Sequence, residues 1–156
     1  MTDATAAERA VMEELIDTAL DRQGSGGPAA IAAAIMRGDT LLARGANEVH
    51  LNHDPSRHAE IVAISAACRA LGTADLSGCT LLTTLQPCEM CLGAIRFAGI
   101  GRVIFAARKG GVQADKYFGF PGLELPDFEA ACAADLATLG GVGEDRILHV
   151  YAEGND

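Results

Sequence analysis

Residues 80–98 decide the fold, and they read TLLTTLQPCEMCLGAIRFA. The first six, Thr80 to Leu85, predict a strand. Pro87 stands where a helix can begin, because its fixed φ suits the first helical turn. Cys88 to Ala98 follow as the predicted helix. The stretch therefore indicates a strand that passes directly into a helix and has two cysteines in the helix's first turn.

The same kind of pattern extends on both sides of this stretch. Helices are expected at residues 5–20, 58–71 and 126–139, and strands at 29–36, 40–46, 102–107 and 146–152. A hairpin turn is expected at residues 37–39, and loops are expected at residues 47–57 and in the glycine-rich segment 109–125. Strands that alternate with helices after an opening hairpin indicate an α/β layered sheet. No repeat or low-complexity tract divides the chain, so we expect a single domain over residues 1–156.

Composition excludes several classes of protein. The chain has 156 residues, of which 49% are hydrophobic and 21% charged, so it can bury a core and is not expected to be disordered. Lys and Arg total 12 against 21 Asp and Glu, a formal net charge of −9. That balance argues against a broad basic face that grips a phosphate backbone. The longest apolar run, residues 28–36, is too short for a bilayer, which needs about 20 residues.

The N-terminus and the cysteines bear on the compartment. The chain starts polar and acidic, without a basic leader or an apolar segment, so we expect no export signal and a cytoplasmic protein. Five cysteines are an odd number, and a reducing compartment would keep them as thiols or metal ligands. Cys68, Cys79 and Cys132 stand singly among small apolar neighbours and are expected to fill the core. Cys88 and Cys91 form the one C-x-x-C of the chain.

Cys88 and Cys91, together with His58, have the spacing of a metal site. The two cysteines are three residues apart, so they lie on the same side of one helical turn. The positive end of the helix lowers the pKa of a thiol and favours the thiolate that a metal needs. Zinc held by Cys, Cys and His keeps its fourth position for water, which is the catalytic arrangement. A fourth protein ligand would close the site, and the candidates are His50, His53 and His149.

Glu60 follows His58 by two residues at the start of the same predicted helix. On a regular helix this spacing turns the side chains apart, but in the first turn both can border one pocket. The metal would lower the pKa of its water to about 7. The adjacent carboxylate could then take a proton and pass it to a leaving group. Such a site suits displacement of an amine by hydroxide at an electron-poor ring carbon.

These residues carry a resemblance to a known family. H-x-E followed by P-C-x-x-C is typical of zinc-dependent nucleobase deaminases. The chain resembles the cytidine deaminase-like superfamily, and within it the branch of tRNA-adenosine, guanine and cytosine deaminases. The similarity runs from about Ala29 to Ala107 and is strongest at Asn47 with residues 58–60 and at residues 83–95.

The resemblance implies a fold and a set of site residues. The fold is a three-layer α/β/α sandwich with a five-stranded mixed sheet, usually in a homodimer or a higher oligomer. Zinc is expected on His58, Cys88 and Cys91, with Glu60 as proton shuttle. The substrate contacts that we expect are Asn47, the backbone amide of Ala59, and Pro87.

A second group of expected substrate contacts lies in the loop 109–125. Tyr117, Phe118 and Phe120 hold three of the seven aromatic residues within four positions. Aromatic side chains in a glycine-rich loop could stack on a planar base or close over it, and Phe118 is our candidate. The alternative is a dimer contact or an anchor for the loop. Asp115 is a polar candidate in the same segment.

The substrate is expected to be small and free. The resembling tRNA-adenosine deaminases typically carry an acidic residue where this chain has Lys109, and a basic C-terminal helix that this chain is not expected to have. With a net charge of −9, these departures favour a small free substrate. The similarity of the central motifs places guanine first, cytosine second and a nucleoside third. We therefore expect a zinc-dependent hydrolase that releases ammonia. The alternatives are tRNA adenosine deamination and a dithiol redox protein that uses Cys88 and Cys91.

Overall fold

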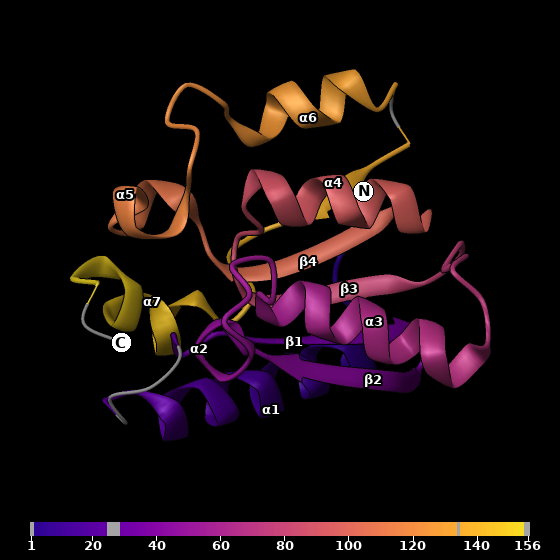
Figure 1. Cartoon of the computed structure of the whole chain (residues 1–156), viewed down its shortest axis with the longest axis horizontal. Coiled ribbons are helices and arrows are strands. Elements are labelled where there is room, and N and C mark those ends of the chain that lie inside the picture. The colour runs from indigo at the N-terminus through magenta and orange to yellow at the C-terminus, as the bar shows by residue number, and fades with distance from the viewer. Residues whose placement is uncertain (1, 25–28, 134, 155–156) are drawn as a thin grey trace.

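A mixed β-sheet forms the centre of the molecule (Figure 1). The computed structural model describes residues 2–24, 29–133 and 135–154. Within these residues the strands are β1 (Ala32–Arg37), β2 (Thr40–Ala46), β3 (Thr80–Leu85), β4 (Arg102–Ala107) and β5 (Ala137–Leu139). Their order across the sheet is β2-β1-β3-β4-β5. β1 pairs antiparallel with β2 and with β3, whereas β3, β4 and β5 run parallel. The predicted five-stranded mixed sheet is confirmed.

Helices cover both faces of this sheet. They are α1 (Ala6–Arg22), α2 (Val49–Asn52), α3 (Ala59–Leu71), α4 (Glu89–Ala98), the 3-10 turn η1 (Lys109–Gly111), α5 (Ala114–Tyr117), α6 (Leu125–Ala131) and α7 (Glu144–Ala152). Successive side chains of a strand point to opposite faces. In β1, Ala34 and Met36 join the buried cluster that includes residues of α1 and α7, whereas Ala33 and Ile35 join the cluster with α3 and α4. The predicted three-layer α/β/α sandwich is confirmed.

Gly45 allows β2 to pass very close to the start of α3. A Cβ atom added at Gly45 would collide with the backbone of Ala59 and Ala63. The closest approach involves the first turn of α3, which directly follows His58. The absence of a side chain at Gly45 therefore helps to determine where the metal-site histidine lies.

The last third of the chain departs from the sequence prediction. The predicted helix 126–139 ends at Ala131, and residues 137–139 form β5 instead; residue 134 of that helix lies outside the described residues. The strand predicted at 146–152 is the helix α7. In α7, Ile147, Val150 and Tyr151 are buried at spacings of three and four residues, which is a helical pattern made of β-branched and aromatic residues. The fifth strand exists, but it lies earlier in the chain than predicted.

Two predicted loops contain short helices. Residues 47–57 include α2, and residues 109–125 include η1 and α5. The remaining predicted elements agree with the structure to within a few residues, and β1 and β2 form the predicted hairpin.

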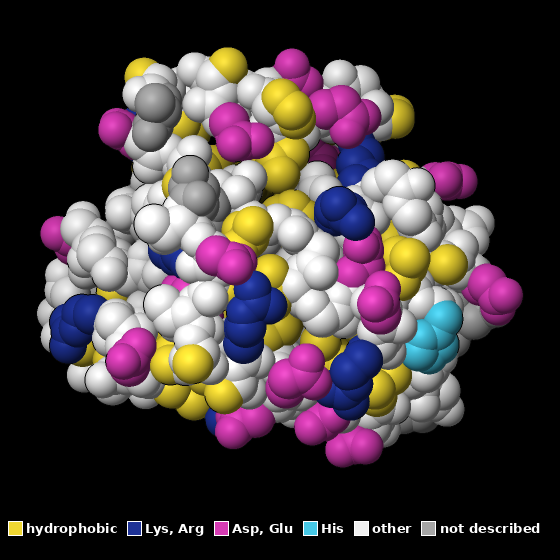
Figure 2. Space-filling view, turned by 180° about the vertical axis from the view of Figure 1, so that it is seen from behind, with side chains coloured by type: hydrophobic (Ala, Val, Ile, Leu, Met, Phe, Trp, Pro, Cys, Tyr) yellow, Lys and Arg dark blue, Asp and Glu magenta, His cyan; other side chains and the backbone are white. Residues whose placement is uncertain are grey.

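Acidic and basic side chains are interspersed on the surface. Figure 2 shows Lys and Arg side chains next to Asp and Glu on one face of the molecule. At least eight of the twelve basic residues form ion pairs with carboxylates. They are Arg9, Arg44, Arg57, Arg96, Arg102, Arg108, Lys109 and Arg146. No helix in the described part of the chain combines the length and the apolar character that a membrane crossing requires.

Candidate metal centre

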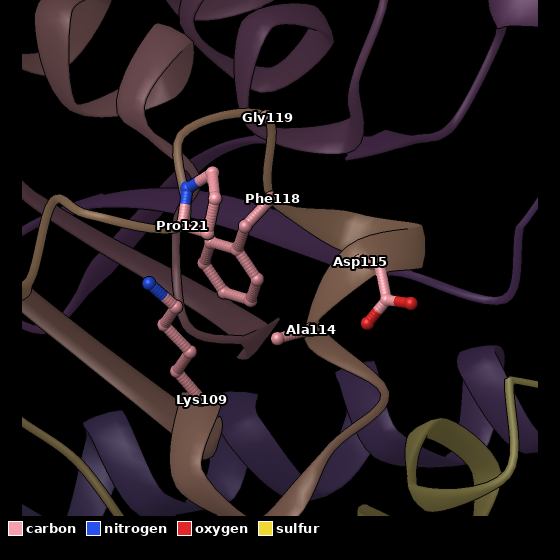
Figure 3. Close-up of a pocket in the computed structure, with 6 residues that line it drawn as sticks. All are labelled: Lys109, Ala114, Asp115, Phe118, Gly119 and Pro121. Carbon is pink, nitrogen blue, oxygen red and sulfur yellow. The ribbon is translucent and has the colours of Figure 1, made fainter.

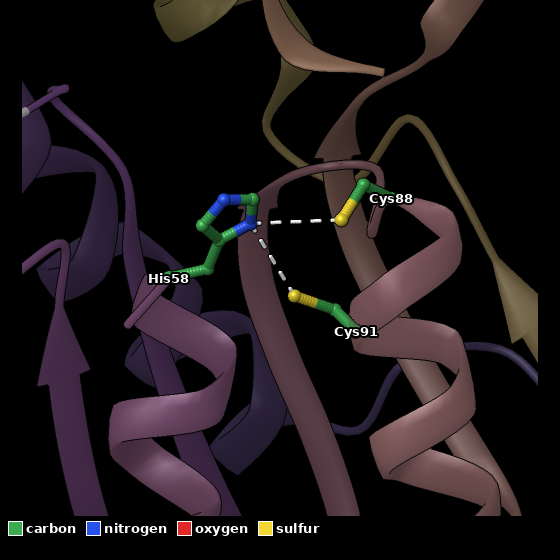
Figure 4. Close-up of side chains that lie close together, drawn as sticks. All are labelled: His58, Cys88 and Cys91. Carbon is green, nitrogen blue, oxygen red and sulfur yellow. Dashed lines mark hydrogen bonds between the residues drawn. The ribbon is translucent and has the colours of Figure 1, made fainter. Parts of the chain in front are cut away.

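The starts of two helices bring three potential metal ligands together (Figure 4). His58 is the N-cap residue of α3, and Cys88 is the N-cap residue of α4, directly after β3. Cys91 lies one turn further into α4 and is fully buried. The Nδ1 atom of His58 is 3.5 Å from Sγ of Cys88 and 3.6 Å from Sγ of Cys91. Residues 30 positions apart in the chain thus point their nitrogen and sulfur atoms at one place.

The donor atoms of this group fit a zinc ion. The ligand atoms of His58, Cys88 and Cys91 all lie within 4.8 Å of one another. One imidazole nitrogen and two sulfurs are donors that zinc prefers, and three protein ligands leave a position for water. None of the other histidines that the structure describes joins this group. Those histidines are His50, His53 and His149, and all are exposed. The geometry therefore favours the open, catalytic type of site.

The pKa values of the two thiols are shifted in opposite directions. A hydrogen bond from the Cys91 thiol, together with His58, lowers the pKa of Cys88 to about 5. The same hydrogen bond and burial raise the pKa of Cys91. Cys88 is therefore the sulfur that is ready as a thiolate, the form in which cysteine binds a metal.

Glu60 lies beside the cysteines and carries an unpaired oxygen. Its side chain is buried, and its Oε1 atom has no hydrogen-bond partner among the described residues. Burial, reinforced by the nearby Cys88 thiolate, raises the pKa of Glu60 to about 7. A buried carboxyl oxygen without a partner costs free energy unless a ligand or water completes it. This unpaired oxygen lies next to the potential metal ligands, where a bound water or ligand can complete its hydrogen bonding.

A cavity of about 110 Å³ adjoins these groups. Its lining residues are Ala29, Ile31, Asn47, His58, Glu60, Leu85, Gln86, Cys88, Lys116 and Tyr117. The Asn47 Oδ1 atom accepts a hydrogen bond from the backbone N–H of Val49 at 3.0 Å, and Arg22 donates to the Asn47 carbonyl oxygen. These contacts hold Asn47 at the cavity wall, where the sequence prediction expected it.

The other predicted substrate residues have different surroundings. Ala59 and Pro87 are buried next to His58 and Cys88, but neither lines the cavity. Asp115 and Phe118 line a separate cavity of about 500 Å³, together with Lys109, Ala114, Gly119 and Pro121 (Figure 3). Phe118 is buried and packs in one cluster with Cys88 and Cys91. Phe118 therefore packs against the two cysteines and does not line the smaller cavity.

Sequence reasoning missed several residues of the cavity wall. Tyr117 belongs to the aromatic group of the loop 109–125, in which the predicted substrate contact is Phe118. Gln86 and Lys116 have no role in the sequence prediction, yet both line the cavity. The position of Gln86 directly before Pro87 and Cys88 is a signal that could have identified it. No local pattern indicates that α5 places Lys116 and Tyr117 at this cavity.

Comparison with known families agrees with this geometry. The model of the cytidine and deoxycytidylate deaminase zinc-binding region matches residues 5–107, which is more than half of the chain. The chain belongs to this family. The matched residues include His58, Glu60, Cys88 and Cys91, so the family's zinc-binding region coincides with the group described above.

Relatives within the family act on different substrates. A guanine deaminase from Bacillus subtilis (strain 168) is 44% identical over 84 residues, 54% of this chain and 53% of the relative. A tRNA-specific adenosine deaminase from Aquifex aeolicus (strain VF5) is 40% identical over 89 residues, 55% of this chain and 59% of the relative. The chain thus spans little more than half the length of these curated relatives.

The solved structures similar to this chain also differ in the molecules they bind or act on. A protein in complex with 8-azaguanine has a TM-score of 0.79 and 27% identity, and the match covers 91% of this chain and 80% of that one. A tRNA:A34 deaminase that carries out A-to-I editing has a TM-score of 0.74 and 29% identity, with coverages of 90% and 99%. The fold is therefore common to a protein that binds 8-azaguanine and to a deaminase that edits tRNA.

Proposed function

We propose that this protein is a zinc-dependent hydrolytic deaminase of a small nucleobase, with guanine as the favoured substrate and cytosine as the second. The observation that carries the proposal is the group of His58, Cys88 and Cys91 beside the unpaired Oε1 of Glu60, at the wall of one cavity. A metal-binding group, a proton-transferring group and a space for a substrate are the three parts that such a reaction needs.

In this proposal each residue has a separate task. His58, Cys88 and Cys91 hold zinc, which when bound lowers the pKa of a coordinated water to about 7. Glu60 accepts a proton at Oε1 and returns it to the amino group that leaves as ammonia, so the carboxyl ends in the state in which it began. Asn47 holds the base through its amide, and the apolar side chains of Ile31 and Leu85 exclude water from the ring's faces.

Guanine is favoured over a tRNA substrate for two reasons. The guanine deaminase relative shares 44% identity with this chain, compared with 40% for the tRNA-specific adenosine deaminase. The net charge is −9, and most of the basic residues already pair with carboxylates, which leaves little positive charge for a phosphate backbone.

The second candidate function is tRNA adenosine deamination. Its specific support is the structural similarity to a tRNA:A34 deaminase, which covers 99% of that chain. This function predicts inosine at a tRNA anticodon and binding that weakens steeply as salt rises. The dithiol redox alternative has no support in the family match.

The test is an ammonia-release assay on zinc-loaded protein. The panel contains guanine, cytosine, adenine, their nucleosides and a tRNA substrate. Turnover of guanine with little turnover of tRNA supports the proposal, whereas inosine formation in tRNA without turnover of any free base contradicts it. Zinc content measured on the same sample shows whether the metal is stoichiometric.

The proposal extends to the oligomeric state and the location of the protein in the cell. We propose a homodimer in the cytoplasm, made of single-domain subunits. Phe97 is 94% exposed and Met90 39% exposed on α4, and a second subunit could cover these side chains. Light scattering of the purified protein measures the oligomeric state directly.

A further inference from the structure

Gln86 is a buried polar residue of the cavity wall to which the proposed mechanism gives no task. It follows β3 and lies two residues before Cys88, and its side chain is 92% removed from solvent, with 8% exposed. It lines the same cavity as His58 and Glu60. A buried amide normally uses both its oxygen and its nitrogen in hydrogen bonds.

One half of the Gln86 amide is occupied. Its Oε1 atom accepts a hydrogen bond from the backbone N–H of Lys109 at 2.9 Å. Because an N–H donor requires an acceptor, this contact determines which end of the amide is the oxygen. The Nε2 group must therefore be on the other side of the amide.

The other half has no partner within the described parts of the chain. Among the described residues, the hydrogen bond with Lys109 is the only one that the Gln86 side chain makes. Nε2 is not fully enclosed, because it is absent from the buried side-chain atoms that lack a partner. Since Gln86 lines the cavity and is otherwise buried, the accessible part of its amide lies at the cavity. Two N–H donors are thus available there to a ligand.

Asn47 repeats this arrangement elsewhere on the wall of the cavity. Its Oδ1 atom accepts from the Val49 N–H, so its Nδ2 group is also the unpaired end of the amide among the described residues. The cavity therefore presents two amide donors and one carboxyl oxygen, from Asn47, Gln86 and Glu60. A ring that carries acceptor atoms on two of its edges is complementary to these two separate donors. Such acceptor atoms are carbonyl oxygens and unprotonated ring nitrogens.

We infer that Gln86 determines substrate specificity by donating a hydrogen bond from Nε2 to an acceptor atom of the substrate ring. The inference rests on the proposed function, which supplies the substrate. Gln86 does not take part in proton transfer, because its amide has no proton to exchange at neutral pH. Gln86 contributes to the binding and orientation of the base. A variant without the Nε2 donor leaves an unpaired acceptor on the bound base.

Two variants separate this role from a structural one. Gln86→Glu keeps an oxygen for the Lys109 N–H but replaces the donor in the cavity by an acceptor. Gln86→Met removes both hydrogen bonds at nearly constant length and without charge. If Gln86 only held Lys109, Gln86→Glu would behave like the wild type and Gln86→Met alone would be impaired.

The measurements are kcat and KM on the base that the wild type deaminates, on protein with verified zinc content. We expect kcat/KM to fall roughly 10- to 100-fold in both variants, mainly through KM. Hydrogen exchange at the Lys109 amide should remain slow in Gln86→Glu and become faster in Gln86→Met. A wild-type KM in either zinc-loaded variant overturns the role of Gln86 and leaves the deaminase proposal intact. A wild type that deaminates no base overturns the proposed function, and with it this role.

Discussion

The Glu60 carboxyl illustrates how one residue acquires chemistry from its surroundings. Burial raises its pKa to about 7, and one of its oxygens has no partner among the described residues. A solvent-exposed glutamate has a pKa near 4.3 and cannot hold a proton at neutral pH. The same side chain enclosed next to His58 and Cys91 can both take and return one.

Replacing Glu60 with Gln tests this role. The variant keeps the size of the side chain and leaves His58, Cys88 and Cys91 unchanged, so zinc content should be retained. The proton-transferring carboxyl is lost, and kcat should fall roughly 10²- to 10⁴-fold. Zinc analysis and steady-state kinetics on one preparation provide both numbers. Glu129→Gln on α6 is the matched control, and undiminished activity in Glu60→Gln would remove the assigned role.

At the scale of elements, the loop after α5 is attached to the start of α4. The Glu89 carboxylate lies between the two cysteines in sequence and accepts backbone hydrogen bonds from Gly119 and from Phe120, the latter at 2.7 Å. Phe118 is thereby held against Cys88 and Cys91. The loop residues therefore depend on a side chain from the metal-binding motif.

Removing this attachment should loosen the loop. In Glu89→Ala, amide exchange at Gly119 and Phe120 should become about tenfold faster or more, because hydrogen bonds to a charged group contribute about 1.5–3 kcal/mol. Glu89→Gln retains an acceptor oxygen and should stay close to the wild type. Hydrogen exchange with mass spectrometry measures both variants. Equal protection in Glu89→Ala and the wild type would show that other contacts hold the loop.

The approach of β2 to α3 gives a second prediction at this scale. In Gly45→Ala the new methyl group collides with the backbone of Ala59 and Ala63, which cannot move as a flexible side chain can. Overpacking of this kind costs about 1–3 kcal/mol. The free energy of unfolding from urea titration should fall by that amount or more. Gly93→Ala on α4, where an added Cβ meets nothing within 4 Å, is the control and should not destabilise the protein.

At the scale of the whole molecule, the ion pair of Glu8 with Arg102 joins α1 to β4, in addition to the pair of Glu14 with Arg44 between α1 and β2. The Glu8 carboxylate accepts hydrogen bonds from Arg102 at 3.0 Å and 2.9 Å, and it also takes part in the capping box of α1 with Thr5. The hydrogen bonds from Arg102 are the main reason why the pKa of Glu8 is lowered. The pair connects residues that are 94 positions apart.

The lowered pKa of Glu8 predicts how stability depends on pH. A carboxyl with a lower pKa in the folded state stabilises the protein above its unfolded pKa of 4.5, and the contribution is lost as pH falls through the folded value. In Glu8→Gln the protein should be about 1–3 kcal/mol less stable at pH 7. The difference from the wild type should shrink below about pH 4. Thermal unfolding from pH 7 to pH 3 checks this, and a constant difference would contradict it.

The amino-acid sequence by itself determined the layered fold and the metal-binding group. Apart from α2, the strands and helices from residue 5 to residue 107 follow local patterns of apolar spacing and turn residues. His58, Cys88 and Cys91 could be predicted as a metal-binding group because their spacing places three ligand side chains at the starts of two helices. The role of Glu60 in proton transfer stays a prediction. The local sequence was enough to predict a feature wherever that feature depends on residues close to one another in the chain.

Only the tertiary structure decided the last third of the chain and the identity of the cavity wall. In α7 the buried residues Ile147, Val150 and Tyr151 have strand propensity, and their burial against α1 and the sheet outweighs that local preference. Tyr117 and Phe118 are adjacent in sequence, yet Tyr117 lines the small cavity and Phe118 packs against the cysteines. The Gln86 amide is oriented by Lys109, 23 residues away, whose backbone N–H donates to its oxygen. Each of these outcomes depends on contacts between distant residues, which no local pattern specifies.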